Sequence, residues 1–270
     1  MRVGIWKTGH EIADTVADAL VAGIPDSIFC RVGDEVSGCD VHIGYGILRG
    51  MDKVYRECER QGKPYFIVDN GYWKPGHYDG YYRISLNGTQ QTTNFPAPDY
   101  ERWERLGLEI KPVRDIDPTK PILACPPSEA VMKFYPDARN WFAPHGAVIR
   151  RKGDGEFDGF ENYRSVSTYN SSMGWKGLLN GVSCVSSGGI MASHPYYAYR
   201  IDLFATMAAL QFTLDEIREG KAWDLIKSPI KKLDSFIDEV KMFHSEGRTQ
   251  DWIALHYHVS RPTVRKALQS

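Results

Sequence analysis

The sequence has few cysteines, no long apolar run and no excess of charge of either sign, and each absence excludes a class of protein. The five cysteines are scattered without CxxC spacing, which argues against a disulfide framework or a zinc site and predicts reduced thiols. No apolar stretch approaches the roughly 20 residues that span a bilayer. The 33 Lys and Arg residues nearly balance 34 Asp and Glu residues, so any contact with nucleic acid depends on a local patch.

The start of the chain, MRVGIWKTGHEIAD, lacks the basic and then apolar pattern of a signal peptide. Together with the reduced cysteines, this start predicts a cytoplasmic protein with no membrane partner. We also expect no metal and no required cofactor, because the acidic, cysteine and histidine residues show no spacing typical of a metal site. The oligomeric state stays open.

Short apolar runs alternate with amphipathic segments over most of the chain, which predicts an α/β fold. Buried strands are expected at 2–6, 26–30, 41–46 and 65–68, and helices at 10–23 and 51–61. Strands that alternate with helices indicate a parallel sheet with helices on both faces. A second series opens with a strand at 121–125 and continues with a helix around 129–134, a strand at 147–151 and a long helix at 196–211. We therefore expect two α/β lobes.

Three domains are predicted from changes in composition along the chain. The Pro-rich, charged crossing IKPVRDIDPTKP separates an N-terminal lobe (1–115) from a C-terminal lobe (116–227). From residue 228 the pattern becomes all-helical, with an apolar stripe at helical spacing, a break at Gly247 and two short helices. Residues 228–270 therefore form a separate helical module.

The segment DNGYWKPGHYDGYYRISLNG (69–88) is expected to be a long loop. Loops of this size after a strand end usually carry function. Asp69 and Asp79 are candidate general bases, and the neighbouring His77 and Tyr81 suit stacking on a base or a sugar. The alternative for each aspartate is turn formation through an Asx side chain.

The segment STYNSSMGWKGLLNGVSCVSSGG (167–189) predicts a strand, a serine-rich turn and the N-terminus of a helix. Free backbone N–H groups and the helix dipole make such a turn an anion site, with the hydroxyls of Ser171 and Ser172 beside it. The alternative is an ordinary helix N-cap.

Two further groups are candidates for binding an anion. Arg150, Arg151 and Lys152 end a C-terminal-lobe strand, where α/β proteins place ligand-binding groups, and their charge suits a diphosphate. A solvated basic cluster is the alternative. His194 precedes Pro195, and a helix that starts at the proline explains this pair as well.

The segment 167–189 resembles the C-terminal signature of GT-B glycosyltransferases related to capsule-polysaccharide transferases, T-x-x-S-x-x-G-(F/W)-(E/K)-(A/G)-L-L-x-G. The residues that match this signature are Thr168, Ser171, Gly174, Trp175, Lys176, Gly177, Leu178, Leu179 and Gly181. The resemblance implies two Rossmann-like lobes and nucleotide-sugar binding at these residues. The family often has Glu at the position of Lys176, which leaves the donor's identity open. His194-Pro195 is similar to the His-Pro motif of related sialic-acid-type transferases, where the histidine contacts the donor phosphate.

The run Asp69-Asn70-Gly71-Tyr72 resembles the E-D-G-F motif of the same capsule transferases. The resemblance implies that Asn70 and Tyr72, with His77 and Tyr81, contact the acceptor. The family's second acidic residue is associated with general-base work, and Asn70 cannot accept a proton. The base is therefore Asp69 or Asp79, or the reaction needs no base at this place.

Residues 248–270 resemble a helix-turn-helix of the resolvase and transcription-regulator kind, through the pattern I-A-x-x-Y-x-V-S-R-x-T-V. This resemblance implies binding to DNA. The residues expected to face phosphates and base edges are Arg261, Thr263, Arg265 and Lys266. A helical hairpin that only packs on the enzyme is the alternative.

Taken together, these resemblances imply a glycosyltransferase that carries its own DNA-binding module. Bacteriophages encode GT-B enzymes that glycosylate 5-hydroxymethylpyrimidines, and we expect this chain to transfer glucose from UDP-glucose to such DNA, in the cytoplasm of the host cell. One alternative is a transferase that acts on a cell-surface polysaccharide. The other is a DNA-binding regulator that has lost catalysis and senses a nucleotide.

Overall fold

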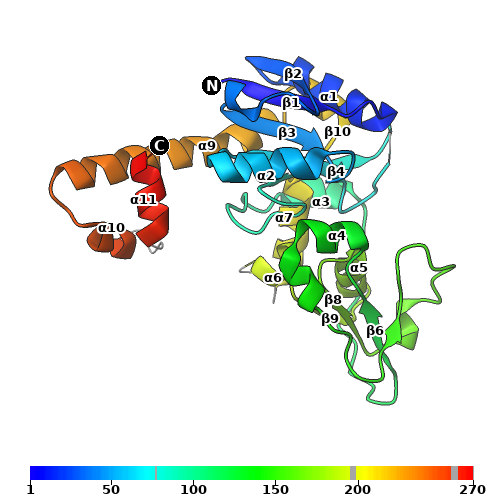
Figure 1. The fold of residues 1–270 in the computed structure, drawn as a ribbon. Helices are drawn as coiled ribbons and strands as arrows, with labels where there is room; N and C mark the ends of the chain where they lie inside the picture. Colours follow the sequence, from blue (N-terminus) through cyan, green and yellow to red (C-terminus); the bar gives the residue numbers. More distant parts are fainter. Residues whose placement is uncertain (77, 195–198, 257–260, 270) are drawn as a thin grey trace.

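The computed structural model describes residues 1–76, 78–194, 199–256 and 261–269. Two β-sheets, each with helices packed against it, form the body of the molecule, and the last helices extend away from both sheets (Figure 1). The expected α/β class with mainly parallel strands is confirmed. Within the described ranges, no helix is both long enough and apolar enough to cross a membrane.

The first sheet has six strands, and all but one come from the N-terminal part of the chain. In sheet order these strands are β10 (Gln211–Thr213), β5 (Tyr81–Leu86), β4 (Tyr65–Asn70), β3 (Val41–Tyr45), β1 (Val3–Lys7) and β2 (Ser27–Arg31). Strands β1 to β4 pair in parallel. Parallel pairing needs long crossover connections, and α1 (Glu11–Gly23) and α2 (Met51–Gln61) supply two of them. The short helix η1 (Val36–Gly38) lies between β2 and β3.

Helices cover both faces of the first sheet, as the alternating pattern predicts. On one face α1 packs with α8 (Leu214–Arg218), and Leu20 and Ile217 are buried there. The two helices approach so closely that a Cβ atom at Gly23 would overlap the carbonyl oxygen of Ile217. On the other face α2 buries Tyr55 against the residues around Trp6.

Two strands of the first sheet were not expected. The expectation of a loop over 69–88 is wrong for Tyr81–Leu86, which form β5 antiparallel to β4. The expected long helix over 196–211 is also wrong at its end, because Gln211–Thr213 form β10, antiparallel to β5. Both strands carry polar residues that are buried, including Arg83 and Gln211. A polar residue inside a buried strand breaks the apolar pattern by which strands are identified.

The second sheet has four strands, all parallel, in the order β7 (Val148–Ile149), β6 (Ile122–Cys125), β8 (Ser165–Thr168) and β9 (Ser183–Ser186). Strand β7 is shorter than the expected 147–151. The helices of this part are α4 (Glu129–Phe134), α5 (Ser172–Leu179), α6 (Ile190–Ser193), η2 (Pro136–Asn140) and η3 (Phe160–Asn162). Leu123, Val166 and Trp175 lie in its core.

The core of the second sheet also takes in residues from the first half of the chain. Tyr72 and Trp73, which follow β4, are part of it. Helix α3 (Tyr100–Arg105) packs beside α7 (Arg200–Ala209), and the rings of Trp103 and Phe204 lie 5.3 Å apart. The two sheets are therefore joined by a shared apolar core.

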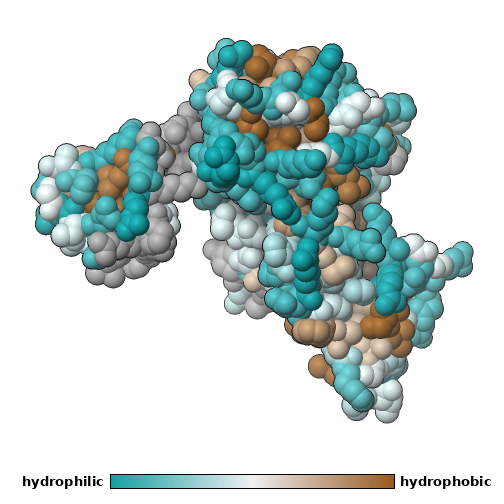
Figure 2. Space-filling model, in the orientation of Figure 1, coloured by the Kyte–Doolittle hydropathy of each residue, from teal (hydrophilic) through white to brown (hydrophobic). Residues whose placement is uncertain are grey.

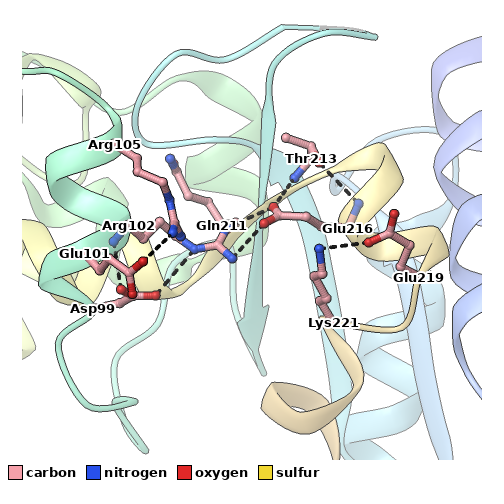
Figure 3. Close-up of polar contacts among 9 residues, drawn as sticks. All are labelled: Asp99, Glu101, Arg102, Arg105, Gln211, Thr213, Glu216, Glu219 and Lys221. Carbon is pink, nitrogen blue, oxygen red and sulfur yellow. Dashed lines mark hydrogen bonds and ion pairs between the residues drawn. The ribbon is translucent and has the colours of Figure 1, made fainter.

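A buried ion pair ties α3 to the edge of the first sheet (Figure 3). The Arg102 guanidinium donates to both carboxylate oxygens of Glu216 at 2.9 Å and to the Gln211 carbonyl oxygen at 2.7 Å. Glu216 also accepts from the Thr213 N–H within a capping box. Burial raises the pKa of Glu216, but the bonds from Arg102 and Thr213 together outweigh it and hold the pKa below its ordinary value.

The last three helices are α9 (Trp223–Ser245), α10 (Gln250–His256) and α11 (Arg261–Gln269). Helix α9 leads away from the sheets, and α10 and α11 pack on its far part (Figure 1). Their small core contains Val240, Ile253 and Val264. The division into 1–115, 116–227 and 228–270 stays a prediction. In the structure β10 and α8 lie in the second of these ranges, but β10 is a strand of the first sheet and α8 packs in the core against that sheet.

Candidate functional site

The carboxyl ends of strands β4 and β8 lie next to each other, although the strands belong to different sheets. The indole N–H of Trp175, on α5, donates to the carbonyl oxygen of Tyr72 at 3.2 Å, and the two rings meet edge to face at 5.3 Å. The Gln90 side chain donates to the Asn170 carbonyl oxygen at 2.7 Å. The two segments that sequence reasoning selected are thus brought together.

Asp69 lies at the end of β4 and is paired with an arginine that the sequence did not single out. The register of β4 and β5 sets Asp69 opposite Arg83, and their side chains form an ion pair of 2.5 Å. The other Asp69 oxygen accepts from the Asn70 N–H at 2.8 Å. With its side chain 31% exposed, Asp69 is both held in place and open to a ligand.

Arg83 is buried and uses its whole guanidinium group for this part of the fold. It donates to the carbonyl oxygens of Thr89 and Asn70, at 2.9 and 2.5 Å, as well as to Asp69. Its charge also lies over the ring of Tyr72 at 5.2 Å. The only signal in the sequence was the alternation of Tyr82, Ile84 and Leu86 around it, which is typical of a strand.

The residues expected to contact the acceptor are spread over different environments. Asn70 is exposed, and its amide oxygen accepts from the Tyr45 hydroxyl at 3.3 Å. Tyr72 is buried in the core between the sheets. Tyr81 is half-buried at the start of β5, where its carbonyl oxygen accepts from the Gly71 N–H. His77 lies outside the described residues.

Asp79 lies in the exposed turn before β5, apart from the Asp69–Arg83 pair. The hydroxyl of the neighbouring Tyr78 donates to Glu11, at the start of α1, at 2.6 Å. A second aspartate therefore stands on the same edge of the sheet without a buried cation to orient it.

The turn after β8 is built by hydroxyl groups. Thr168 is buried, donates to the Cys125 carbonyl oxygen at 3.0 Å and accepts from the Ser171 N–H at 2.9 Å. Ser171 is the N-cap of α5 and accepts from the Met173 N–H. Ser172, the first helical residue, is half-buried. The N-terminus of α5 thus opens at the carboxyl edge of the second sheet. The N–H groups of Met173 and Gly174 are already bonded to Ser171, so the Ser172 N–H and the helix dipole are what would favour an anion here.

Two other residues of the α5 signature have different surroundings. Gly174 is buried, and a Cβ atom there would overlap the side chain of Met191 on α6. The glycine therefore allows the close packing of α5 against α6. Lys176 is exposed on the outer side of α5.

The basic cluster follows β7 at the same edge. Arg150 is half-buried and holds its own loop, since it donates to the Gly155 carbonyl oxygen at 2.6 Å and lies over the Phe157 ring. Arg151 and Lys152 are exposed. Of the three, these two are placed to meet a ligand from solvent.

His194 is buried behind α6. Its Nε2 atom lies 3.0 Å from the Thr206 hydroxyl, and its ring packs edge-on against Phe95. Burial lowers the pKa of His194, which favours the neutral ring. In this structure the side chain contacts the core rather than the edge where the hydroxyl groups gather.

Gln90 is a residue that the sequence did not mark. It is buried, and its amide oxygen accepts from the Ile190 N–H at 3.1 Å while its amide nitrogen reaches Asn170. Gly189 has φ of +72°, and a Cβ atom there would overlap the Gln90 side chain. This glutamine connects the chain after β5 to two turns of the second sheet.

The predicted DNA-binding residues lie on α11. Thr263 and Arg265 are exposed, and Val264 between them is buried. The side chains of Arg261 and Lys266, and the predicted turn over 257–260, lie outside the described part. Within the described residues, no group of three or more His, Cys, Asp or Glu side chains is placed to hold a metal ion.

No protein-family model matches the chain, and no curated protein matches it. Among solved structures, it is similar to a Thermosulfurimonas dismutans KpsC, beta Kdo 2,4 transferase, with 10% identity and a TM-score of 0.38 over 77% of this chain and 90% of that chain. It is also similar to the KpsC, beta Kdo 2,7 transferase of the same organism, with 11% identity and a TM-score of 0.40 over 81% of this chain and 98% of that chain. At these values no residue role is carried over.

Proposed function

We propose that this protein is a glycosyltransferase that takes a sugar from a nucleotide donor. The observation that supports it most is the contact between the carboxyl edges of the two sheets. One carries an oriented, part-exposed carboxylate, Asp69, and the other carries the N-terminus of a helix capped by Ser171. The Trp175–Tyr72 hydrogen bond joins them. Sugar transfer needs a base near the acceptor hydroxyl and positive groups near the leaving diphosphate.

The proposed donor is UDP-glucose, which the resemblance to GT-B transferases implies. Its diphosphate would meet the first turn of α5 and the exposed charges of Arg151 and Lys152. Thr168 would act on the donor indirectly, because its hydroxyl already shapes the turn. The negative charge that develops on the diphosphate is stabilised by such fixed N–H groups and cations.

Asp69 is the proposed base. Its carboxylate takes the proton of the acceptor hydroxyl while that oxygen bonds to the anomeric carbon of the sugar. The bond from this carbon to the diphosphate breaks, and its electron pair leaves with UDP. Arg83 orients the carboxylate, and its own position is fixed because it also donates to the Thr89 and Asn70 carbonyl oxygens.

DNA that carries a 5-hydroxymethylpyrimidine is the proposed acceptor. The support is the α10–α11 pair, in which Ile253 and Val264 form a core and Arg265 faces solvent. A helix of this kind reaches phosphates and base edges. The modified base would have to leave the stack to reach Asp69, so the module's role is to keep DNA close to the edge of the sheets.

The test is a transfer assay with radiolabelled UDP-sugars. The acceptors are duplex DNA with hydroxymethylated pyrimidines, the same DNA without the modification, and a capsular polysaccharide. Label on the modified DNA alone is the expected result. Label on the polysaccharide would replace the proposed acceptor, and no donor cleavage with any acceptor would favour a nucleotide-sensing regulator.

The DNA-binding module is tested separately by salt dependence. We expect Arg265→Gln combined with Lys266→Gln to weaken binding of long duplex DNA and to reduce the slope of log affinity against log salt by about one for each phosphate that the variant no longer neutralises. The matched control is Arg105→Gln combined with Arg218→Gln, which removes two exposed charges outside the module. Equal slopes for all forms would show that α10 and α11 only pack against α9.

A further inference from the structure

A pocket of about 210 Å³ lies between the first turn of α2 and the last turn of α4. Figure 1 shows α4 directly below α2, so the pocket lies where the two sheets meet. Its volume is below the several hundred Å³ of sites that enclose a whole drug-sized ligand. The space therefore suits one functional group of a ligand rather than a complete nucleotide sugar.

The pocket has an excess of positive charge. Arg49, Lys53 and Lys133 line it, and Asp52 is the single carboxylate among the lining residues. Lys133 pairs with Asp52 at 3.4 Å, and the Asp52 side chain is only 14% exposed. The charges of Arg49 and Lys53 are thus left without compensation inside the lining. Both are exposed, and Figure 2 shows a mainly hydrophilic surface over α2.

One wall of the pocket is apolar. Phe134 is half-buried there, with its ring held edge-on by Tyr55 at 6.2 Å and by Tyr135 at 4.8 Å. Leu48 also lines the space, and its side chain is 55% exposed, so it is open to a ligand. Cationic groups beside an aromatic and an aliphatic side chain suit an anion attached to a sugar or a base.

The walls are held in place by contacts between the two helices. Arg56 of α2 donates to the Lys133 carbonyl oxygen at 2.8 Å, in addition to the Asp52–Lys133 ion pair. The pocket also lies near the proposed catalytic edge: Arg49 follows β3, whose last residue, Tyr45, donates to Asn70.

We propose that this pocket binds the phosphate group of a phosphate ester, with the adjoining sugar or base on Phe134 and Leu48. The phosphate belongs either to a nucleic-acid strand or to a free nucleotide, since both present the same charge and the same neighbouring groups. Lys53 and Arg49 bind the phosphate oxygens, and Lys133 stays paired with Asp52 and neutralises its carboxylate. The proposal requires no transfer reaction.

The test compares two double variants with the same loss of charge. Arg49→Gln with Lys53→Gln removes the two uncompensated pocket cations, and Arg60→Gln with Arg105→Gln removes two exposed arginines outside the pocket. The probes are inorganic phosphate, thymidine monophosphate and a short oligothymidylate, without a sugar donor. Affinity is measured by calorimetry for the first two and by fluorescence anisotropy for the third, and thermal unfolding checks that both variants fold.

The pocket variant should bind at least one phosphate ester more weakly than the wild type by about tenfold or more, because each charge-assisted bond contributes about a factor of ten. The control variant should bind as the wild type does. Weaker binding of both esters identifies a free nucleotide, and weaker binding of oligothymidylate alone identifies a strand phosphate. Leu48→Ser should weaken ester binding and leave inorganic phosphate unchanged. Equal affinities for the pocket and control variants, or no binding of any probe by the wild type, would overturn the proposal. These outcomes are independent of the transfer assay.

Discussion

The carboxyl edges of the two sheets present their polar groups in different ways. At the first edge the polar group is a side chain: Asp69 projects from β4 and is held by buried Arg83 from the next strand. At the second edge the buried hydroxyl of Thr168 and the cap Ser171 are engaged by the main chain, and they shape the turn at the N-terminus of α5, where the helix dipole favours an anion. The first edge is thus suited to move a proton, and the second to hold an anion.

This contrast indicates which substitutions should change chemistry and which should change binding. In the proposed reaction a single side chain carries the function of the first edge, so its loss is not replaced. Several donors would share the function of the second edge, and the backbone donors survive any side-chain substitution. The four predictions that follow are ordered from the largest expected effect to the smallest.

Asp69→Asn should lower kcat by about 10²–10⁴-fold with donor affinity unchanged, because the amide keeps the hydrogen bond to Arg83 but cannot take a proton. Asp79→Asn serves as the comparison, since Asp79 lies exposed in the turn before β5. The measurement is turnover of the transfer reaction together with calorimetric binding of UDP. If both variants keep near-normal turnover, the first edge does not supply the base.

Arg102→Met should lower the free energy of unfolding by about 3–5 kcal/mol, because it leaves the part-buried Glu216 carboxylate without its cation. Arg102 connects α3, next to the second core, with the edge of the first sheet. Arg105→Met on the same helix is the matched control, since its pair with Glu101 is exposed (Figure 3) and should contribute no more than about 1 kcal/mol. Urea unfolding of the three proteins gives the values, and similar losses for both variants would contradict the assignment.

The free energy of unfolding should fall as the pH is lowered from 6.5 to 4. The reason is that burial, together with the nearby charge of Lys63, lowers the pKa of His42 from 6.5 to about 4. In that window the unfolded chain binds a proton that the folded protein does not, so the loss reaches about 3 kcal/mol at the lower end. His42→Gln keeps an acceptor for the Trp6 indole N–H and should remove this part of the dependence. His145→Gln, at an exposed position, should leave the pH profile as it is.

Removing the charges at the second edge should have a smaller effect than removing Asp69. Arg151→Ala combined with Lys152→Ala should weaken UDP binding by about tenfold, the value of one charge-assisted hydrogen bond. Ser171→Ala should weaken it less, because the backbone N–H groups of α5 remain, although removal of the cap costs about 1 kcal/mol of stability. A larger effect on UDP binding from Ser171→Ala than from the basic pair would show that side chains, not the backbone, bind the anion at this edge.

Local patterns predicted much of the second edge and only part of the first. The Ser171 cap and α5 could be predicted because the serine-rich turn and the helix that it precedes are neighbours in the sequence. Arg83 could not be predicted as a site residue, because β5 has an arginine and a serine at buried positions and its sequence therefore resembles a polar loop. Gln90 and the α2–α4 pocket left no pattern at all, since each depends on groups far apart in the chain.

The sequence by itself determined the α/β class and most of the individual strands and helices, including α2 and α4 at their full bounds. The periodicity of apolar residues, the helix caps and the glycines that end helices are local signals over a few residues, so they can be recognised in the sequence. Only the tertiary structure decided that Asp69 faces Arg83, that Trp175 meets Tyr72, and that cations from two helices share a pocket. The physical reason is that such contacts come from strand pairing and from packing between elements that are not neighbours in the sequence, so no local pattern of residues marks them.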